Sequence, residues 1–202
     1  MTKEIIMKEA LHLFAQKGYE AVSIRELAKK VGIKESSIYA HFSSKEEIFR
    51  SVISNYDFFG YDDFNLEEFK KNPFSQFELR AERIIRCLEN KDYLAYAKMA
   101  QLECLKDGPA RELVRAESFD KIEKFFENLL EIMIGMNYFK NCDKKLMVAE
   151  YIGPFYFLHT KLVSNILSKK EKEEIVQTMR KHLSHFFNVF RNTLEDRGCY
   201  ER

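Results

Sequence analysis

The sequence predicts an all-α fold, because breakers of regular structure are scarce and apolar residues recur at helical spacing. The 202 residues include only 7 glycines and 3 prolines, too few for the many tight turns of a β-sandwich, barrel or propeller. Hydrophobic residues make up 46% of the chain and charged residues 32%, so a buried core and a polar surface can both form. We expect about nine helices, the early ones short and the later ones long.

The first two helices are predicted from their apolar spacing and their caps. Apolar residues recur at three-to-four spacing over residues 3–16, and Gly18 follows as a carboxy-terminal cap. Ser23 and Glu26 stand at the spacing of a capping box, in which each side chain satisfies a free backbone amide. They open a short second helix, which ends at Gly32.

Two further short helices follow directly. The third is predicted over residues 34–42. Ser44 and Glu47 form a second capping box, which opens a fourth helix that extends to about residue 56.

The later helices are longer and less interrupted. Residues 57–73 contain glycine, proline, aspartate and asparagine, and we expect a partly structured connection there. Gly153 and Pro154 are expected to kink the helix that contains them. The five predicted helices span residues 74–89, 92–105, 110–136, 143–167 and 169–195.

Residues 24–42 have the pattern of a helix-turn-helix. Two helices that cross steeply need a small side chain at their closest approach, and Ala28 supplies it. The turn needs a residue that tolerates positive φ, which Gly32 supplies, while Ile38 and Phe42 fill the space against the preceding helices. On these residues alone, an incidental pair of packed helices stays open as the alternative.

The same stretch resembles the DNA-binding domain of TetR/AcrR-type regulators. The resemblance covers about residues 5–53. Its most distinctive part is the segment Tyr-x-His-Phe-x-x-Lys-Glu, which begins at Tyr39. We therefore expect residues 1–48 to form a three-helix DNA-binding domain, and residues 49–202 to form a larger helical domain for effector binding and dimerisation.

The third helix is expected to enter the major groove with the face opposite Ile38 and Phe42. Helix amino termini and cations are expected to contact phosphate. Glu35 either accepts a hydrogen bond from a cytosine amino group or points away from DNA as a favourable first-turn acid. His41 either contacts phosphate, as the resemblance implies, or packs within the protein. The predicted DNA-contacting residues are Ser23, Arg25, Lys34, Glu35, Ser36, Ser37, Tyr39, Ala40, His41 and Lys45.

The last helix is apolar over an arc wider than one face, so it is expected to bury two sides. Together with the preceding long helix it would form a four-helix interface across a two-fold axis, as the resemblance also implies. The alternative is an internal helix of a monomer. The residues predicted for the dimer interface are Met179, Leu183, Phe186, Phe187 and Phe190.

Aromatic residues and methionines also recur at helical spacing in the middle helices. Such a stripe is commonly plain core, whereas the resemblance implies a cavity for a mostly apolar effector. The predicted pocket residues are Tyr93, Tyr96, Met99, Phe126, Met133, Tyr151, Phe155 and His159.

Composition and motifs exclude several other classes. The net charge of +1 argues against a general polycation, so DNA binding has to come from a local patch. The four cysteines include no C-x-x-C pair and indicate reduced thiols. The sequence shows no signal core, membrane span, Walker loop, nucleophile elbow or zinc-protease helix, so we expect a cytoplasmic protein without catalytic residues or cofactor. His182 and His185 lie three residues apart but lack a third ligand at suitable spacing, so no metal site is expected.

The sequence and the resemblance together imply a ligand-responsive transcriptional repressor. It would act as a homodimer on a double-stranded DNA operator and be released when a small apolar effector binds the larger domain. One alternative is a helical DNA-binding factor of nucleoid or division type, without a small-molecule switch. A helical enzyme is the remote alternative.

Overall fold

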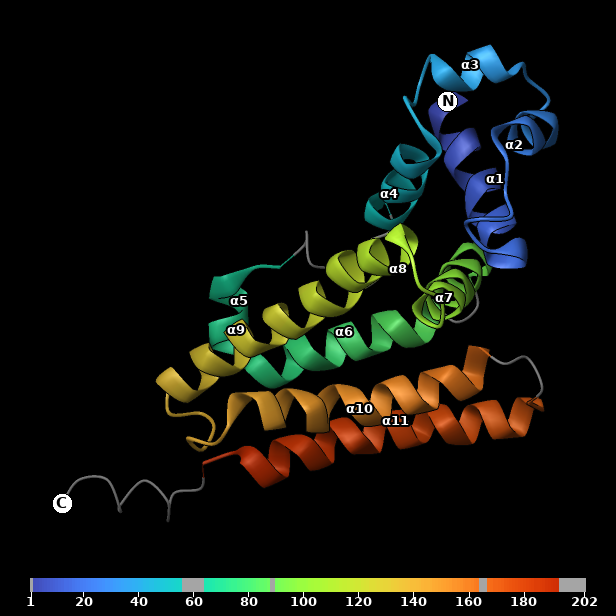
Figure 1. The fold of residues 1–202 in the computed structure, drawn as a ribbon. Coiled ribbons are helices and arrows are strands. Elements are labelled where there is room, and N and C mark those ends of the chain that lie inside the picture. Colours follow the sequence, from blue (N-terminus) through green and yellow to red (C-terminus); the bar gives the residue numbers. More distant parts are fainter. Residues whose placement is uncertain (1, 56–63, 88–89, 164–166, 193–202) are drawn as a thin grey trace. The chain divides into compact units, whose positions relative to one another are not determined.

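The computed structural model describes residues 2–55, 64–87, 90–163 and 167–192 (Figure 1). They form α-helices, and the β pairing among them is one isolated antiparallel bridge between Phe139 and Arg191. The all-α prediction is therefore confirmed. The helices are α1 Thr2–Lys17, α2 Ile24–Val31, α3 Glu35–Tyr39, α4 Lys45–Asn55, α5 Leu66–Lys71, α6 Pro73–Cys87, α7 Lys91–Cys104, α8 Pro109–Val114, α9 Lys121–Gly135, α10 Lys144–Val163 and α11 Lys169–Phe190.

A π-helical stretch, Arg115–Asp120, joins α8 to α9, so these three segments form one continuous helix. In this stretch the Ser118 side chain is buried and lies 2.7 Å from the Tyr96 hydroxyl of α7. With the joined segments taken as one, the described residues contain ten helices, against the nine expected.

The additional helix is α5, in the stretch that was expected to be partly structured. Asn65 caps it, because its side-chain oxygen accepts hydrogen bonds from the backbone N–H groups of Glu67 and Glu68. Phe69 is fully buried and anchors this short helix in the core. The remainder of the connection, residues 56–63, lies outside the described residues.

Two other predicted helices differ in detail from the observed ones. The helix predicted over residues 143–167 is α10, which passes through Pro154 as one element. The last helix ends at Phe190, five residues before the predicted end, because Arg191 adopts an extended conformation. The Asn192 side chain then donates to the carbonyl oxygens of Asn137 and Phe139, which fixes the chain against the turn after α9.

The chain packs as two compact units, Met1–Phe58 with Cys87–Lys121, and Phe59–Arg86 with Ile122–Arg202. These two compact units do not coincide with the predicted DNA-binding domain, residues 1–48, and the predicted effector-binding and dimerisation domain, residues 49–202. The predicted boundary after residue 48 falls inside α4, and α7 and α8 pack with the amino-terminal helices. The functional division stays a prediction.

Aromatic rings pack together in the core of the first unit. The ring of Phe49 lies 5.2 Å from that of Phe14 and 4.9 Å from that of Tyr19, measured between centroids. Helix α7 is attached to α1 by the Asp92 carboxylate, which lies 2.8 Å from the His12 ring. These contacts join α1, α4 and α7 into one packed unit.

The second unit is a helical bundle in which α10 and α11 lie side by side (Figure 1). Its core is rich in phenylalanine and tyrosine. The Tyr151 ring lies 4.8 Å from that of Phe126 and 5.2 Å from those of Phe77 and Phe186. Edge-to-face and tilted contacts of this kind add to the free energy gained by burial.

Candidate nucleic-acid interface

The turn between α2 and α3 has the predicted geometry of a helix-turn-helix. Gly32 has a φ angle of 80°, in the left-handed region that favours glycine. The backbone amides of Gly32 and Ile33 both donate to the Ala28 carbonyl, at 2.9 and 3.0 Å, and so close the end of α2. Ala28 is buried, as the close crossing of the two helices requires.

Helix α3 presents one polar face. Ile38 and Phe42 are buried, whereas Ser36, Tyr39 and Ala40 are exposed, as the sequence predicts. The helix proper ends at Tyr39, three residues earlier than expected. The last turn is nevertheless closed, because the Phe42 amide donates to the Ile38 carbonyl at 3.0 Å.

The predicted capping box at the start of α2 is half formed. The Ser23 hydroxyl accepts from the Glu26 amide at 3.1 Å, which caps the helix. The Glu26 carboxylate pairs with the Lys17 ammonium rather than completing the box. Ser23 and Arg25 are exposed at this helix terminus, where unpaired amides favour an anion.

The predicted box at the start of α4 is also altered. The Ser44 hydroxyl accepts from the Glu47 amide at 3.1 Å. The Glu47 carboxylate, however, accepts from the hydroxyl and backbone amide of Ser43, both at 2.6 Å, and so reaches one residue further back. These hydrogen bonds lower the pKa of Glu47 below its usual range, so a negative charge lies beside this helix terminus.

Lys45 is bound within the protein. Its ammonium donates to the carbonyls of Tyr19 and Glu20, at 2.9 and 3.3 Å, and lies 4.3 Å from the centre of the Tyr19 ring. Because an ammonium has three N–H donors, one is left for a phosphate. The sequence predicted the phosphate contact but not this internal role.

The remaining predicted DNA-contacting residues differ in how exposed their side chains are. Lys34, Glu35 and His41 are exposed and Ser37 is half-buried. Lys3 was missed by the sequence reasoning. Its ammonium lies 5.1 Å from the ring of Phe42, which brings a cation beside the end of α3. The sequence carries no signal for this, because the contact is between residues far apart in the chain.

Residues 6–52 match the family model described as "Bacterial regulatory proteins, tetR family". This protein is 40% identical to IcaR of Staphylococcus epidermidis, the negative transcriptional regulator of the biofilm operon icaADBC. The alignment covers 53 residues, 26% of the chain. Residues 6–52 are thus similar to the amino-terminal domain of TetR-family regulators. The aligned part spans 29% of the length of that relative.

Solved structures of transcriptional regulators share the fold over almost the whole chain. TylP, a TetR regulator from Streptomyces fradiae, is 19% identical and superposes with a TM-score of 0.70, covering 98% of this chain and 90% of its own. The flavonoid-responsive regulator FrrA is 18% identical, with a TM-score of 0.65 and coverages of 94% and 97%. At these identities the likeness concerns the fold.

The predicted effector-pocket residues fall in both compact units. Tyr93, Tyr96 and Met99 of α7 are buried in the first unit. The other five belong to the second unit: Phe126, Met133, Tyr151 and Phe155 are buried there, and His159 is half-buried. Desolvation lowers the pKa of His159 to about 4, so its ring is neutral at pH 7. The pocket itself stays a prediction.

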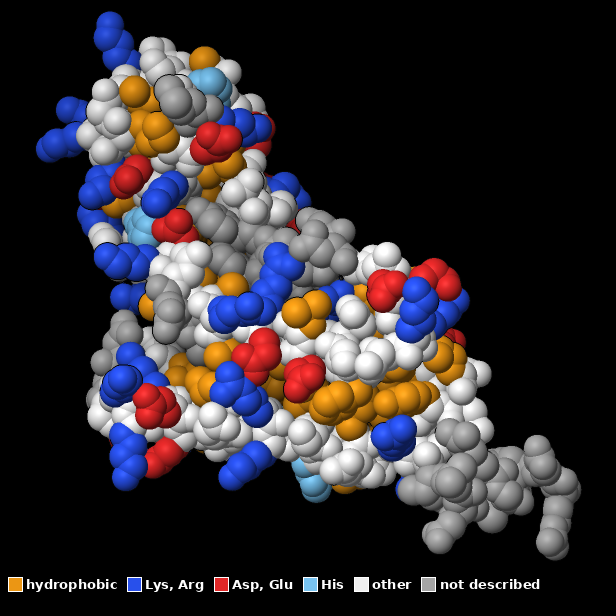
Figure 2. Space-filling model, turned by 180° about the vertical axis from the view of Figure 1, so that it is seen from behind, with side chains coloured by type: hydrophobic (Ala, Val, Ile, Leu, Met, Phe, Trp, Pro, Cys, Tyr) orange, Lys and Arg blue, Asp and Glu red, His pale blue; other side chains and the backbone are white. Residues whose placement is uncertain are grey.

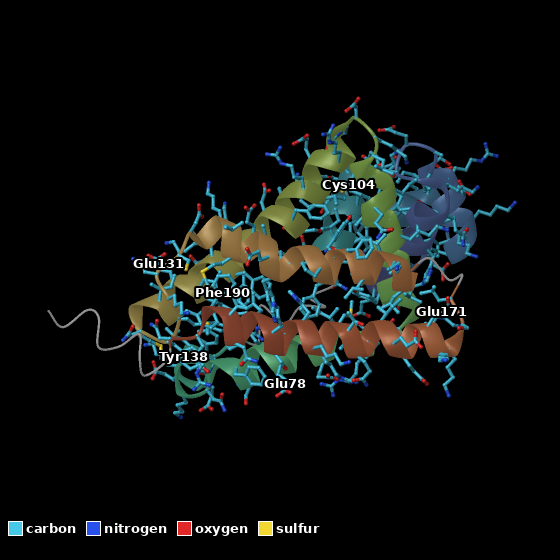
Figure 3. All side chains as sticks on the ribbon, turned by 90° about the horizontal axis from the view of Figure 1, so that it is seen from below. Glu78, Cys104, Glu131, Tyr138, Glu171 and Phe190 are labelled. Atoms are coloured by element: carbon cyan, nitrogen blue, oxygen red, sulfur yellow. The ribbon has the colours of Figure 1, made fainter. Side chains whose placement is uncertain are left out.

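The predicted dimer interface requires correction. Met179, Leu183, Phe186 and Phe187 are buried within the chain itself, so this stripe of α11 is core and unavailable to a second copy. Phe190, labelled in Figure 3, is half-buried, with its ring centroid 4.8 Å from that of Phe186.

Other apolar side chains of α10 and α11 face outward. Tyr156, Phe157 and Val189 are 45%, 61% and 45% exposed, and Leu146 is 57% exposed. Figure 2 shows hydrophobic side chains gathered on the surface of the second unit. Contiguous exposed apolar patches are typical of surfaces that bind another protein chain.

Two further properties bear on the class of protein. Among the described residues, no group of three or more histidine, cysteine, aspartate or glutamate side chains is placed to hold a metal ion. None of the helices described is both long and apolar enough to cross a membrane.

Proposed function

We propose that this TetR-family chain is a sequence-specific DNA-binding regulator that represses transcription as a homodimer and leaves its operator when a small apolar molecule binds. The observation that supports DNA binding is the exposed face of α3, flanked by the amino termini of α2 and α4. Its side chains at Ser36 and Ala40 are short, so the helix backbone can approach base edges closely.

The charges near α3 suit a phosphate backbone. Arg25, Lys29, Lys30 and Lys34 are all exposed on α2 and the turn after it. Figure 2 shows Lys and Arg side chains projecting from the part of the molecule that these short helices form. Since the whole chain has a net charge of only +1, this local group provides the attraction.

A homodimer follows from DNA geometry and from the outward apolar side chains of α10 and α11. Two recognition helices must be held about 34 Å apart to enter successive major grooves. Burial of Tyr156, Phe157 and Val189 against a second copy would supply a hydrophobic contact at the expected place.

The effector response is the finer part of the proposal. The second unit contains a large aromatic core and, on α10, the neutral and half-buried His159. An apolar core and a neutral polar ring suit an apolar molecule with a polar group. FrrA, which shares the fold, is described as flavonoid-responsive. The effector would act by binding more tightly to the conformation whose recognition helices do not match the groove spacing.

The test of DNA binding is selection of duplexes from a random-sequence library by the purified protein, followed by titration of the selected duplex at several salt concentrations. We expect affinity to fall steeply between about 50 and 200 mM salt. Arg25→Ala should reduce the slope of log K against log salt by about 0.9 for each subunit, because one phosphate contact is lost. Arg86→Ala, which changes an exposed arginine of α6, is the control with an unchanged slope.

Selection of no sequence, or equal slopes for Arg25→Ala and Arg86→Ala, would contradict the proposed DNA contacts. The effector response is tested separately by thermal shift with a panel of flavonoids and other apolar compounds. We expect at least one compound to raise the melting temperature and to release the selected duplex. Intact DNA binding without any stabilising compound would indicate a regulator without a small-molecule switch.

A further inference from the structure

Tyr19 lies between two charged side chains from different parts of the first unit. Its backbone N–H donates to Oε1 of Glu103 in α7, at 2.9 Å. Its carbonyl oxygen accepts from Nζ of Lys45, at 2.9 Å, and its ring lies beneath the same ammonium. One residue of the loop between α1 and α2 therefore connects α7 to the amino terminus of α4.

The Glu103 carboxylate has two partners in a buried site. Glu103 is 2% exposed, and a buried carboxylate is stable only when it is paired and hydrogen-bonded. The Lys106 ammonium supplies the charge at 2.8 Å, and the Tyr19 amide supplies a second hydrogen bond to the same oxygen. Movement of the Tyr19 backbone away from α7 would leave Glu103 with one partner fewer in a buried site.

The neighbours of Tyr19 also fit this contact closely. Gly18 has a φ angle of 82°, and a Cβ atom there would meet the Lys106 ammonium and come within 2.9 Å of the Glu103 carboxylate, so glycine leaves room for this ion pair. On the other side, the Tyr19 ring packs on Phe14 and Phe49, with centroids 5.8 and 4.9 Å apart. Both the backbone and the ring of Tyr19 are thereby fixed.

The orientation of Lys45 depends on Tyr19. Two of the three ammonium N–H groups donate to the carbonyls of Tyr19 and Glu20. In a tetrahedral ammonium, the directions of two donors determine the direction of the third. The position of the Tyr19 carbonyl therefore determines where Lys45 can place its remaining donor.

We propose that Glu103 is a positioning residue for DNA binding, which acts by holding Tyr19 so that the third N–H of Lys45 is directed at a backbone phosphate. The inference rests on the proposed DNA-binding function and assigns that function a residue on α7, outside the helix-turn-helix. Glu103 itself does not touch DNA, so its effect passes entirely through Tyr19 and Lys45.

The test is a double-mutant cycle on the selected duplex with Lys45→Met and Glu103→Ala. Each single variant is expected to lower the slope of log K against log salt by about 0.9 per subunit, because the same phosphate contact is lost in both. The double variant should lose no more than Lys45→Met alone. Additive losses, or a wild-type slope for Glu103→Ala, would overturn the proposal.

Two further variants separate positioning from general destabilisation. Glu103→Gln keeps an oxygen that accepts from the Tyr19 amide, and we expect it to restore the wild-type slope even if its melting temperature is lower. Tyr19→Phe removes only the hydroxyl, and the contacts described use the ring and backbone, so its slope should be unchanged. A lowered slope in Glu103→Gln equal to that in Glu103→Ala would count against the proposal.

A measurement without DNA distinguishes failure of this inference from failure of the proposed function. The ring of Tyr19 should shift the NMR resonances of the Lys45 side chain, because the ammonium lies 4.3 Å from the ring centre. This shift should disappear in Glu103→Ala and persist in Glu103→Gln. Persistence in both variants would refute the positioning role whether or not the protein selects a DNA sequence.

Discussion

Gly32 allows the chain to turn between α2 and α3 because its φ angle is positive, and a methyl group there would meet no atom within 4 Å. The cost of Gly32→Ala is therefore conformational, about 1 kcal/mol of unfolding free energy. Gly135→Ala is the matched control, since its added methyl group also meets nothing within 4 Å but the residue is helical. We expect Gly135→Ala to be neutral or stabilising. Urea denaturation of both variants measures the difference, and equal effects would contradict the argument.

His159 should make stability depend on pH. Its pKa is about 4 in the folded protein against an ordinary value of 6.5, so the unfolded chain binds the proton more readily between these values. The contribution of His159 to the free energy of unfolding is thus fully present above pH 6.5, falls as the pH drops towards 4, and levels off below that pH. The loss should be roughly 2 kcal/mol, since one pKa unit is worth about 1.4 kcal/mol and the ring is only half-buried.

The measurement is urea denaturation at pH 7 and pH 4.5 for the wild type and His159→Gln. All other titrating groups are common to both proteins, so the difference between their pH dependences isolates this ring. A variant that loses as much stability as the wild type between the two pH values would show that His159 is not the cause.

At this scale the sequence predicted which residues are exposed near the turn, because helical spacing places Ser36 and Ala40 opposite Ile38. It did not predict the partners of Glu47 and Lys45. Ser43 and Ser44 offer Glu47 similar hydroxyls one residue apart, and pattern alone does not decide between them. The partner of Lys45 is a loop carbonyl whose position depends on tertiary packing.

Helices α2 and α11 are each capped at the amino terminus by a serine hydroxyl, and α11 has in addition the reciprocal hydrogen bond from the Ser168 amide to Glu171. The hydroxyls of Ser23 and Ser168 accept from the amides of Glu26 and Glu171, at 3.1 and 3.3 Å. Ser23→Ala and Ser168→Ala should each lower the unfolding free energy by about 1 kcal/mol. Only Ser23→Ala should also weaken binding to the selected duplex, because that hydroxyl lies at the proposed phosphate site.

Thermal denaturation and DNA titration of both variants check this prediction. If the two variants lower the affinity for the selected duplex equally, general destabilisation explains the lower affinity, and Ser23 has no phosphate contact.

Long, strongly periodic helices were predicted correctly in type and order, because a buried face repeats over many turns. The short α5 was missed, since six residues give too little periodicity and its anchor is one buried residue, Phe69. The end of α11 was also missed. It is determined by hydrogen bonds from Asn192 to the turn after α9, a contact between distant residues.

For the molecule as a whole, the apolar side chains outside the core predict how two copies associate. Phe157 is 61% exposed on α10, and Phe157→Glu should place a charge in the dimer contact. Sedimentation should then give the mass of one chain instead of two, and affinity for the selected duplex should fall. Leu105→Glu changes a residue that is 88% exposed in the first unit and should remain dimeric. A wild-type chain that sediments as a monomer would contradict the dimer.

At this largest scale the sequence was least informative. The wide apolar arc of α11 predicted two buried sides, and the stripe assigned to the partner is covered by the chain's own aromatic residues, as Phe187 on Phe77 and Phe139 illustrates. Burial of the second side against another copy stays a prediction. The packing of α7 with the amino-terminal helices depends on contacts such as His12 with Asp92, which no local pattern shows. Tertiary contacts, and not the pattern of any single helix, determine which apolar helix faces pack together.

The π-helical stretch between α8 and α9 affects how this protein can be compared with its relatives. Such a stretch amounts to one extra residue within a helical ladder, and one residue corresponds to about 100° of rotation. In a relative whose corresponding helix is uninterrupted, the equivalents of inward-facing positions before Ser118 are therefore displaced by one residue from those after it. Substitutions transferred by ungapped alignment along this helix would exchange a core position for a surface one.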